Sequence, residues 1–268
     1  MTEWTDRRVW DAVEEWRWFP PSSVRKVRDL YELAVTPGSY ALTFAYGLHA
    51  PDGPAADAAL GELRHDVEEL GGTGVRVRVT SLSVPPDLPD RLVRQGYRAI
   101  EETDVLAWEL RDPALRPRLP EFRPVAGISI EETRTDDEFD AFLRLSTAIF
   151  GDPEPSAETL EGFRNAFHRN LRDQGHSDRY LARSGPEPIG RAGMEVVGEV
   201  ARLWGTGVLP EHRGRGVYGA LVRARCEEAV RRGATLALVN ARVGTSGPIL
   251  TRHGFRGVGK LRFFEARW

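Results

Sequence analysis

The residues best suited to chemistry lie in the segment 208–233, which reads VLPEHRGRGVYGALVRARCEEAVRRG. Within it, Gly214 and Gly216 alternate with Arg213 and Arg215 just before a stretch with helical periodicity. Glycine permits positive φ and lets the backbone approach a phosphate closely, while arginine supplies charged donors for phosphate oxygens. The N–H groups of a helix's first turn also favour an anion. The spacing therefore predicts a pyrophosphate-binding turn between a strand and a helix.

Two common phosphate-binding motifs do not match this turn. A P-loop needs a lysine followed by Ser or Thr, and a dinucleotide-binding motif needs G-x-G-x-x-G with an acidic residue about 20 positions later. The order of Arg213, Gly216 and a helix instead resembles the Arg/Gln-x-x-Gly-x-Gly/Ala loop of the GNAT superfamily of acetyl-CoA-dependent N-acetyltransferases. Tyr218 stands where that loop ends with a small residue.

The resemblance continues on both sides of the loop. Residues 235–239 (TLALV) are similar to the family's next strand, and residues 246–255 (SGPILTRHGF) to its closing helix and Gly-Phe pair. Residues 179–208 are predicted to form three strands, as in the family. The resemblance covers roughly residues 125–268 and extends to actinobacterial two-lobed GNAT proteins. It implies an α/β fold with a mixed sheet.

The first half of the chain repeats this order of elements. A predicted helix at residues 57–70 and a predicted strand at 75–79 are followed by the run 92–98 (LVRQGYR), which matches the run 250–256 (LTRHGFR). A strand is also predicted at residues 39–46 from its alternation. We therefore expect two GNAT-like lobes, the first of them degenerate.

The predicted domain boundaries follow from a Pro- and Arg-rich stretch between the lobes. They place the degenerate lobe at residues 1–115, a linker at 116–124 and the acetyltransferase domain at 125–268. In the first lobe, residues 49–56 occupy the position of the phosphate loop and contain two prolines but no lysine or arginine. Proline removes N–H donors, so we expect this lobe to bind no coenzyme.

Composition restricts the partners. The chain has 268 residues, 41% of them hydrophobic, and a net charge of −3, which does not favour nucleic acid as a partner. Cys226 is the only cysteine, so a reducing cytoplasmic setting is expected. The sequence shows no secretion signal and no long apolar run, so no membrane partner is predicted. His168 and His176 lack a metal-ligand spacing, so no metal is expected. A monomer or a homodimer fits these features.

The resemblance implies direct attack of an amine on the thioester of acetyl-CoA, here a cosubstrate. An alkylammonium like that of lysine is neutral at pH 7 only to on the order of one part in a thousand, so a base is useful. In the family, a backbone amide of the strand before the loop stabilises the oxyanion, and Val208 is the matching position. The implied coenzyme contacts are Val208, Leu209, Pro210, Arg213, Gly214, Arg215, Gly216, Val217, Tyr218 and Gly219.

Neither of the family's usual catalytic side chains is present. Leu250 stands where a tyrosine general acid is frequent, and Arg202 where an acidic base is frequent. The remaining catalytic candidates are Glu195, Glu199 and Tyr218, with His212 beside the loop as an alternative base. Each also has a purely structural interpretation, as a solvated acid, a turn cap or a packed ring.

These residues leave three functions open. The first is an N-acetyltransferase for an amine of a small molecule, favoured over a peptide N-terminus or a lysine. The second is a catalytically silent acyl-CoA-binding protein with a regulatory or assembly role. The third is an antibiotic-resistance acetyltransferase, which predicts an electronegative pocket near Asp152, Glu154 and Glu195.

Overall fold

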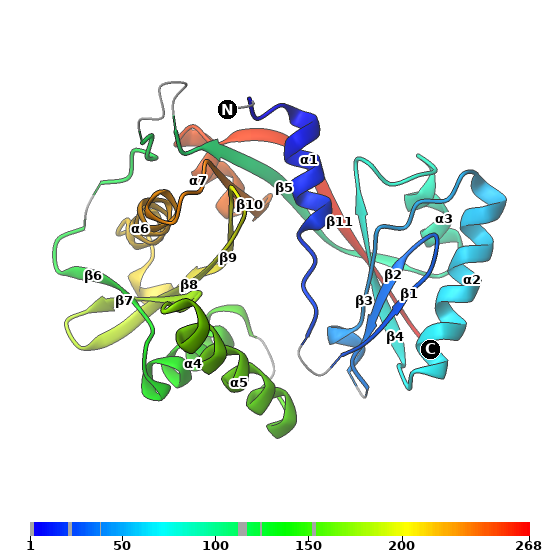
Figure 1. The fold of residues 1–268 in the computed structure, drawn as a ribbon, viewed down its shortest axis with the longest axis horizontal. Coiled ribbons are helices and arrows are strands. Elements are labelled where there is room, and N and C mark those ends of the chain that lie inside the picture. The colour runs from blue at the N-terminus through cyan, green and yellow to red at the C-terminus, as the bar shows by residue number, and fades with distance from the viewer. Residues whose placement is uncertain (1–2, 21–22, 38, 112–116, 124, 152–153) are drawn as a thin grey trace. The chain divides into compact units, whose positions relative to one another are not determined.

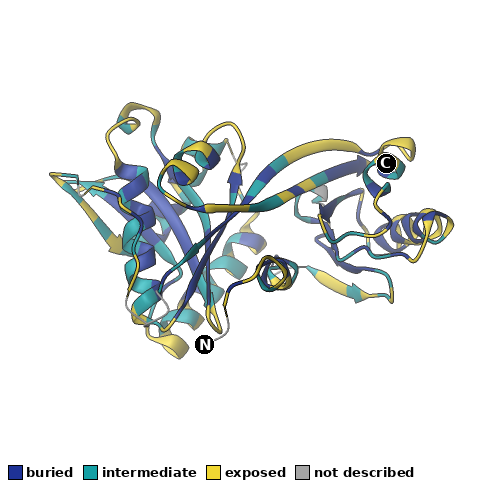
Figure 2. Ribbon diagram, turned by 90° about the horizontal axis from the view of Figure 1, so that it is seen from above, coloured by how far each residue is buried: buried dark blue, intermediate teal, exposed yellow. Residues whose placement is uncertain are grey.

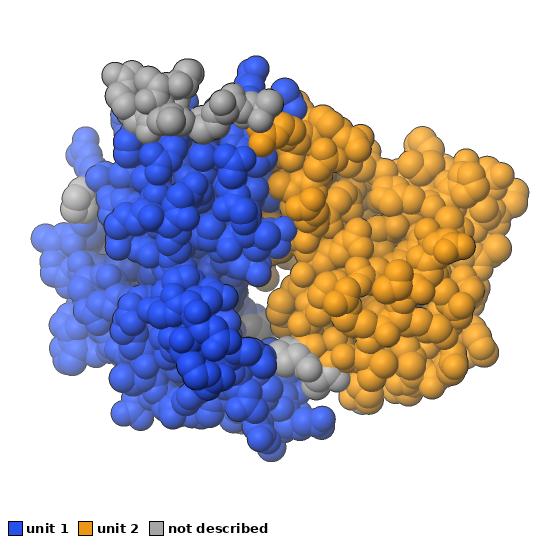
Figure 3. Space-filling view, viewed as in Figure 1, with its two compact units in different colours: residues 1–5, 106–240, 248–257 blue, residues 6–105, 241–247, 258–268 orange. Residues whose placement is uncertain are grey.

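The structure is a computed structural model that describes residues 3–20, 23–37, 39–111, 117–123, 125–151 and 154–268. Two compact units are assembled from separate segments of the chain (Figure 3). Unit 1 comprises residues 1–5, 106–240 and 248–257, and unit 2 comprises residues 6–105, 241–247 and 258–268. Both contain sheet and helices, so the predicted mixed α/β class is confirmed (Figure 1).

The sheet of unit 1 carries the predicted phosphate loop. Its strand order is β5-β10-β9-β8-β7-β6, in which β10 runs parallel to β9 and the pairs from β9 to β6 are antiparallel. The strands are β5 (Arg98–Glu109), β6 (Ile128–Glu132), β7 (Arg179–Ser184), β8 (Glu187–Val197), β9 (Val200–Val208) and β10 (Leu236–Arg242).

Helices α4 (Asp136–Phe150) and α5 (Ala157–Gln174) begin at side-chain caps. Thr135 and Glu138 form a capping box at the start of α4, as the sequence around Thr135 predicts. The helices pack together through stacked rings of Phe139 and Phe167, whose centroids lie 4.9 Å apart. This pair of helices contributes Phe142 and Leu145 to the core over β7.

Helix α6 (Val217–Arg231) packs on β8 and β9 through Leu221, Val222 and Cys226. Cys226 is fully buried, and burial raises the pKa of its thiol to about 12, so it is an inert core residue. Helix α7 (Ser246–Arg252) follows β10. Strands β8, β9 and β10 are largely buried. Figure 2 also shows helices with one exposed face and strands with exposed stretches.

Unit 2 has the strand order β1-β2-β3-β4-β11-β5. Its remaining elements are α1 (Asp6–Glu15), β1 (Val24–Val27), β2 (Glu32–Val35), β3 (Phe44–Tyr46), α2 (Gly53–Glu69), β4 (Gly74–Thr80), α3 (Leu88–Arg94) and β11 (Arg256–Arg267). Leu60, Leu63 and Val67 of α2 are buried in its core. The strand predicted at residues 39–46 is shorter than expected, because Tyr40–Leu42 forms a 3-10 turn before β3.

The last strand of the chain completes the sheet of the first lobe. Strand β11 pairs with β4 in antiparallel register, from Leu261↔Thr80 to Arg267↔Gly74. Residues 258–268 therefore belong to unit 2, although they lie inside the predicted domain 125–268. The compact units divide the chain differently from the predicted boundaries, which remain a proposal.

The internal repeat has a matching backbone conformation in both copies. Gly96 follows α3 and Gly254 follows α7, each with a φ of 88°. The residue after each glycine donates its N–H back to a leucine carbonyl, from Tyr97 to Leu92 at 2.9 Å and from Phe255 to Leu250 at 3.1 Å. The matched sequence runs therefore encode the same helix ending.

Candidate coenzyme loop and acceptor site

The predicted phosphate loop ends in a helix start that lacks a side-chain cap. Gly214 and Gly216 have φ values of 74° and 82°, and both are exposed. Gly216 is the N-cap of α6 and supplies no side chain, whereas Thr135 and Ser156 cap α4 and α5 with their hydroxyls. Among α4, α5 and α6, it is thus α6 whose first-turn N–H groups have no side-chain cap and can receive an anion from outside the chain.

Charged side chains flank this helix start. Arg213 donates from Nε to the carbonyl of Val208 at 3.1 Å, which ties the loop to the end of β9. Arg215 Nη1 lies 3.0 Å from Nδ1 of His212, within the turn Pro210–His212. Both arginines are exposed, so their remaining donors face solvent at the loop. His212 was a candidate base, and its Nδ1 is already engaged by Arg215.

Small residues allow close packing around the loop. A Cβ on Gly219 would lie 2.3 Å from the ring of Phe122, and one on Gly216 would lie 3.0 Å from Cγ2 of Val125. Val217 is buried and Tyr218 is half-buried in the first turn of α6. The segment before β6 therefore lies against the start of the helix.

Strands β9 and β10 separate before they reach the loop. Their parallel pairing runs from Val200↔Leu236 to Leu203↔Val239, so the last five residues of β9 extend beyond it. Leu209 donates its N–H to Ile189 on the β8 side at 2.9 Å. Because successive N–H groups of a regular strand alternate in direction, that of Val208 points to the opposite side, toward the separation. Leu209, also predicted as a coenzyme contact, uses its amide elsewhere.

A β-bulge shapes the same part of β9. The register with β8 passes from Gly193↔Trp204 to Arg191↔Gly207, which leaves one extra residue on β9. Gly205, with a φ of 57°, lies at this point. Thr206 thus lies between the loop and the part of β9 that pairs with β10.

The predicted catalytic glutamates occupy different places. Glu195 lies opposite Arg202 on β9 and forms an ion pair with it at 3.5 Å. Glu199 is exposed in the turn between β8 and β9. At roughly 3.3 Å per residue, it lies about 30 Å along the strand from Val208. Of the two, only Glu195 lies within a strand of the sheet.

Asp178 is a carboxyl group that the sequence reasoning missed. It precedes β7 and accepts a hydrogen bond from the amide of Asn170 on α5. Burial raises the pKa of Asp178 to about 6, Arg179 lowers it, and the charge of Glu195 raises it further. No local sequence pattern marks this residue, because its partners lie on α5 and β8.

The carboxyl group of Asp178 therefore lies within electrostatic range of Glu195 in unit 1. The backbone carbonyl of Asp178 accepts from Met194, which pairs with Leu203, so Asp178 is level with Leu203 across the sheet. Thr206 is about 10 Å further along the strand direction and two strands, roughly 10 Å, to the side. A group bound between them must bridge that distance.

Other predicted features add little to this site. Asp152 lies outside the described residues, and Glu154 is exposed. Leu250, at the position of the family's frequent tyrosine, is fully buried. Among the described residues, no group of three or more His, Cys, Asp or Glu side chains is placed to hold a metal ion.

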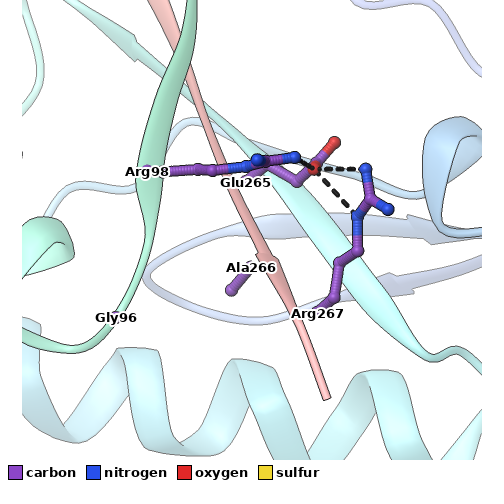
Figure 4. A pocket seen from close by; sticks show the side chains of 5 residues that line it. All are labelled: Gly96, Arg98, Glu265, Ala266 and Arg267. Carbon is purple, nitrogen blue, oxygen red and sulfur yellow. Dashed lines mark hydrogen bonds and ion pairs between the residues drawn. The ribbon is translucent and has the colours of Figure 1, made fainter.

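A shallow pocket in unit 2 contains none of the predicted site residues. It is lined by Gly96, Arg98, Glu265, Ala266 and Arg267 (Figure 4). Glu265 is buried and accepts from Arg98 at 3.0 Å and from Arg267 at 2.9 Å. This arrangement is an ion-pair cluster that stabilises the end of β11.

Comparison with known proteins assigns part of the chain to a family. The model of the Acetyltransferase (GNAT) family matches residues 139–246, which include β7 to β10, the bulge and the loop before α6. This segment is a GNAT domain. A search of curated proteins gave no match.

Solved structures show that the GNAT fold extends over the whole chain. A GCN5-related N-acetyltransferase from Kribbella flavida is 18% identical with a TM-score of 0.67, covering 99% of this chain and 96% of that one. A GCN5-related N-acetyltransferase from Sphaerobacter thermophilus is 19% identical with a TM-score of 0.63, covering 96% and 84%. A tandem GNAT protein from the clavulanic acid biosynthesis pathway is 18% identical with a TM-score of 0.60, covering 97% and 87%. The predicted two-lobed GNAT architecture is confirmed.

Acyl transfer is the general activity of the GNAT family, to which the matched segment belongs. Within the described part of the chain, no helix is both long enough and apolar enough to cross a membrane.

Proposed function

We propose that the protein is an N-acetyltransferase that moves an acetyl group from acetyl-CoA to an amine of a small molecule. The observation that carries this proposal is the uncapped start of α6, with Gly214 and Gly216 at positive φ, next to the separation of β9 from β10. A pyrophosphate requires the first feature, and an extended arm that pairs with a strand edge requires the second.

The coenzyme residues have separate roles in this proposal. The N–H groups of Val217, Tyr218 and Gly219 face the pyrophosphate, and Arg213 and Arg215 add charged donors. The amide of Val208 faces the pantetheine arm and the thioester. Pro210 and Leu209 fix the exit of the strand rather than donate to the ligand, because Pro210 has no N–H and the N–H of Leu209 is bound to Ile189.

An ammonium acceptor loses two protons in this reaction, one before the attack and one as the amide forms, and one thiolate is released. The amine nitrogen attacks the thioester carbon, the C–S bond breaks, and the electron pair leaves with the CoA sulfur. A thiolate with a pKa near 8.5 leaves with little help from an acid, which is consistent with the absence of a tyrosine at Leu250. The first proton of the ammonium must go to a base, and the second goes to the leaving thiolate or to solvent.

We assign the first proton to Asp178 and Glu195. A carboxyl group whose pKa is about 6 is ionised at neutral pH and close to the best compromise for a general base. The two carboxylates also attract a cationic acceptor. Because Asp178 lies further from Thr206 than one hydrogen bond spans, the proton travels through water or through Glu195. Tyr218 serves the coenzyme rather than the proton in this scheme, and Glu199 has no part in it.

The first lobe is proposed to bind no coenzyme. Its helix α2 begins at Asp52, whose carboxylate accepts the N–H of Ala55 and so fills the anion position. A Cβ on Gly53 would lie 1.8 Å from the guanidinium of Arg91, which shows that this side chain covers the helix start. The proposed location is the cytoplasm, since the single cysteine is a buried free thiol.

A panel of amines tests the proposal. Thiol release from acetyl-CoA is followed with a polyamine, an amino sugar, an amino acid and a peptide with a free N-terminus. We expect turnover with a small-molecule amine and its loss in Gly216→Asp, which places a carboxylate at the pyrophosphate position. Binding of acetyl-CoA without turnover on any amine would instead favour a silent acyl-CoA-binding protein.

A further inference from the structure

Arg225 of α6 is the largest fully buried side chain of the described residues. Its hydrogen bonds go to neutral acceptors on three elements: Nε to the carbonyl of Leu221 at 3.0 Å, Nη1 to the carbonyl of Gly193 at 2.7 Å, and Nη2 to Oγ1 of Thr206 at 2.7 Å. Within the described part of the chain, no carboxylate lies within ion-pairing distance of it. It is thus a buried positive charge held by dipoles alone.

Such a group is expensive to bury. Burial lowers the pKa of Arg225, and the nearby Tyr218 raises it by a smaller amount. A guanidinium remains protonated under these conditions, so its charge persists in the interior. A hydrophobic side chain of similar size in a helix core avoids this desolvation cost. The arginine therefore needs an explanation beyond packing.

Two of the three acceptors belong to the bulge. Met194 donates its N–H toward β7, so by alternation the groups of Gly193 face β9, at the point where the register shifts. At this register shift Arg225 donates to the carbonyl of Gly193. The same guanidinium holds the side chain of Thr206, the residue that follows Gly205.

We propose that Arg225 is a positioning residue that fixes the β9 bulge and so holds the end of β9, with the amide of Val208, against the acyl carbonyl, while its buried charge stabilises the oxyanion. This inference rests on the proposed acetyl transfer at the same site. Arg225 acts through its hydrogen bond to Thr206 and through the electrostatic field of its guanidinium charge, without contact with the substrate. The three fixed donors need a planar guanidinium, because a lysine ammonium cannot reach acceptors on three elements at once.

The test compares kcat with acetyl-CoA affinity. Arg225→Met removes the donors and the charge, and we expect kcat to fall about 100-fold while the Kd for acetyl-CoA changes less than about threefold, since the pyrophosphate loop is intact. Arg225→Lys keeps the charge and should recover only part of kcat. Thr206→Val removes one acceptor and should lower kcat about tenfold, whereas Thr206→Ser restores it.

Two further measurements distinguish a loss of acyl-group positioning in Arg225→Met from a loss of folding. Arg231→Met, on the exposed face of the same helix, is the control and should leave kcat unchanged. The stretching frequency of the acetyl carbonyl, read by infrared difference spectroscopy with isotopically labelled acetyl-CoA, should be lowered on binding to the wild type and return toward the free value in Arg225→Met. Each variant is measured at a temperature where circular dichroism shows it folded.

The outcomes are distinct. An unchanged carbonyl frequency and an unchanged kcat in folded Arg225→Met would overturn the proposal and leave Arg225 as a structural residue. If the wild type acetylates no amine, the proposed function fails, and the carbonyl frequency still decides whether Arg225 positions the acyl group.

Discussion

Replacing Asp178 with asparagine separates the stability of the fold from the proposed proton transfer. The folded-state pKa of Asp178 is about 6, compared with an ordinary value of 3.8. The raised value means that the folded state binds the proton more tightly than the unfolded state. The contribution of Asp178 to the free energy of unfolding is therefore favourable at low pH and is lost as the pH rises from about 4 to 6. Above pH 6 the ionised carboxylate costs the fold about 3 kcal/mol.

Asparagine keeps the shape and still accepts from Asn170, but it carries no charge. We expect Asp178→Asn to gain stability relative to the wild type by about 2 to 3 kcal/mol between pH 4 and pH 7.5, measured by urea unfolding at each pH. The same change should lower kcat/KM for a cationic acceptor about 10- to 100-fold, because the base is lost. Higher stability together with lower activity is expected when the replaced group serves the function but lowers the stability of the fold.

The control is Asp173→Asn on α5, where the carboxylate is 57% exposed. It should show no such difference between the two pH values. If the stability difference between the wild type and Asp178→Asn does not change with pH, the fold does not raise the pKa of this carboxyl group, which contradicts the prediction. If that difference appears but kcat/KM is unaffected, Asp178 is a buried acid with no part in proton removal.

Three further substitutions test other parts of the account. Gly216→Ala must hold a φ of 82° with its Cβ 3.0 Å from Val125, so calorimetry should show an acetyl-CoA Kd about tenfold weaker, whereas an unchanged Kd would contradict the role of this turn. Thr135→Ala removes the capping box of α4 and should lower the free energy of unfolding by about 1 kcal/mol in urea titration. Leu250→Tyr introduces the family's frequent side chain at a fully buried position, so we expect a destabilisation of about 1 to 3 kcal/mol and no gain in kcat; a faster enzyme would show that the site accepts an acid there.

Local signals in the sequence predicted most elements of unit 1. Pro210 after a strand, glycine-spaced arginines before a periodic helix, and Gly233 after it are short-range features, and they correspond to β9, the loop and α6. The repeat of Leu92–Arg98 and Leu250–Arg256 was visible because both copies end a helix at a glycine with positive φ. Such turns are fixed by a few adjacent residues.

The pairing of strands that lie far apart in the chain was harder to predict from the sequence. Nothing in residues 258–267 indicates that this strand pairs with β4 rather than with its neighbours in sequence, since partner choice depends on the whole sheet. The bulge at Gly205 gave no signal beyond one more glycine in a glycine-rich chain. Arg225 and Asp178 were missed for the same reason, because each is defined by partners on other elements.

We expect one acetyl-CoA to bind per chain, at the loop before α6. Calorimetric titration of the full chain tests this most directly, with Gly216→Asp titrated in parallel. The wild type should show a single site with micromolar affinity, and the variant no detectable heat of binding. Two sites per chain would mean that the first lobe also binds coenzyme, and no binding by the wild type, or equal binding by Gly216→Asp, would contradict the assignment of this loop.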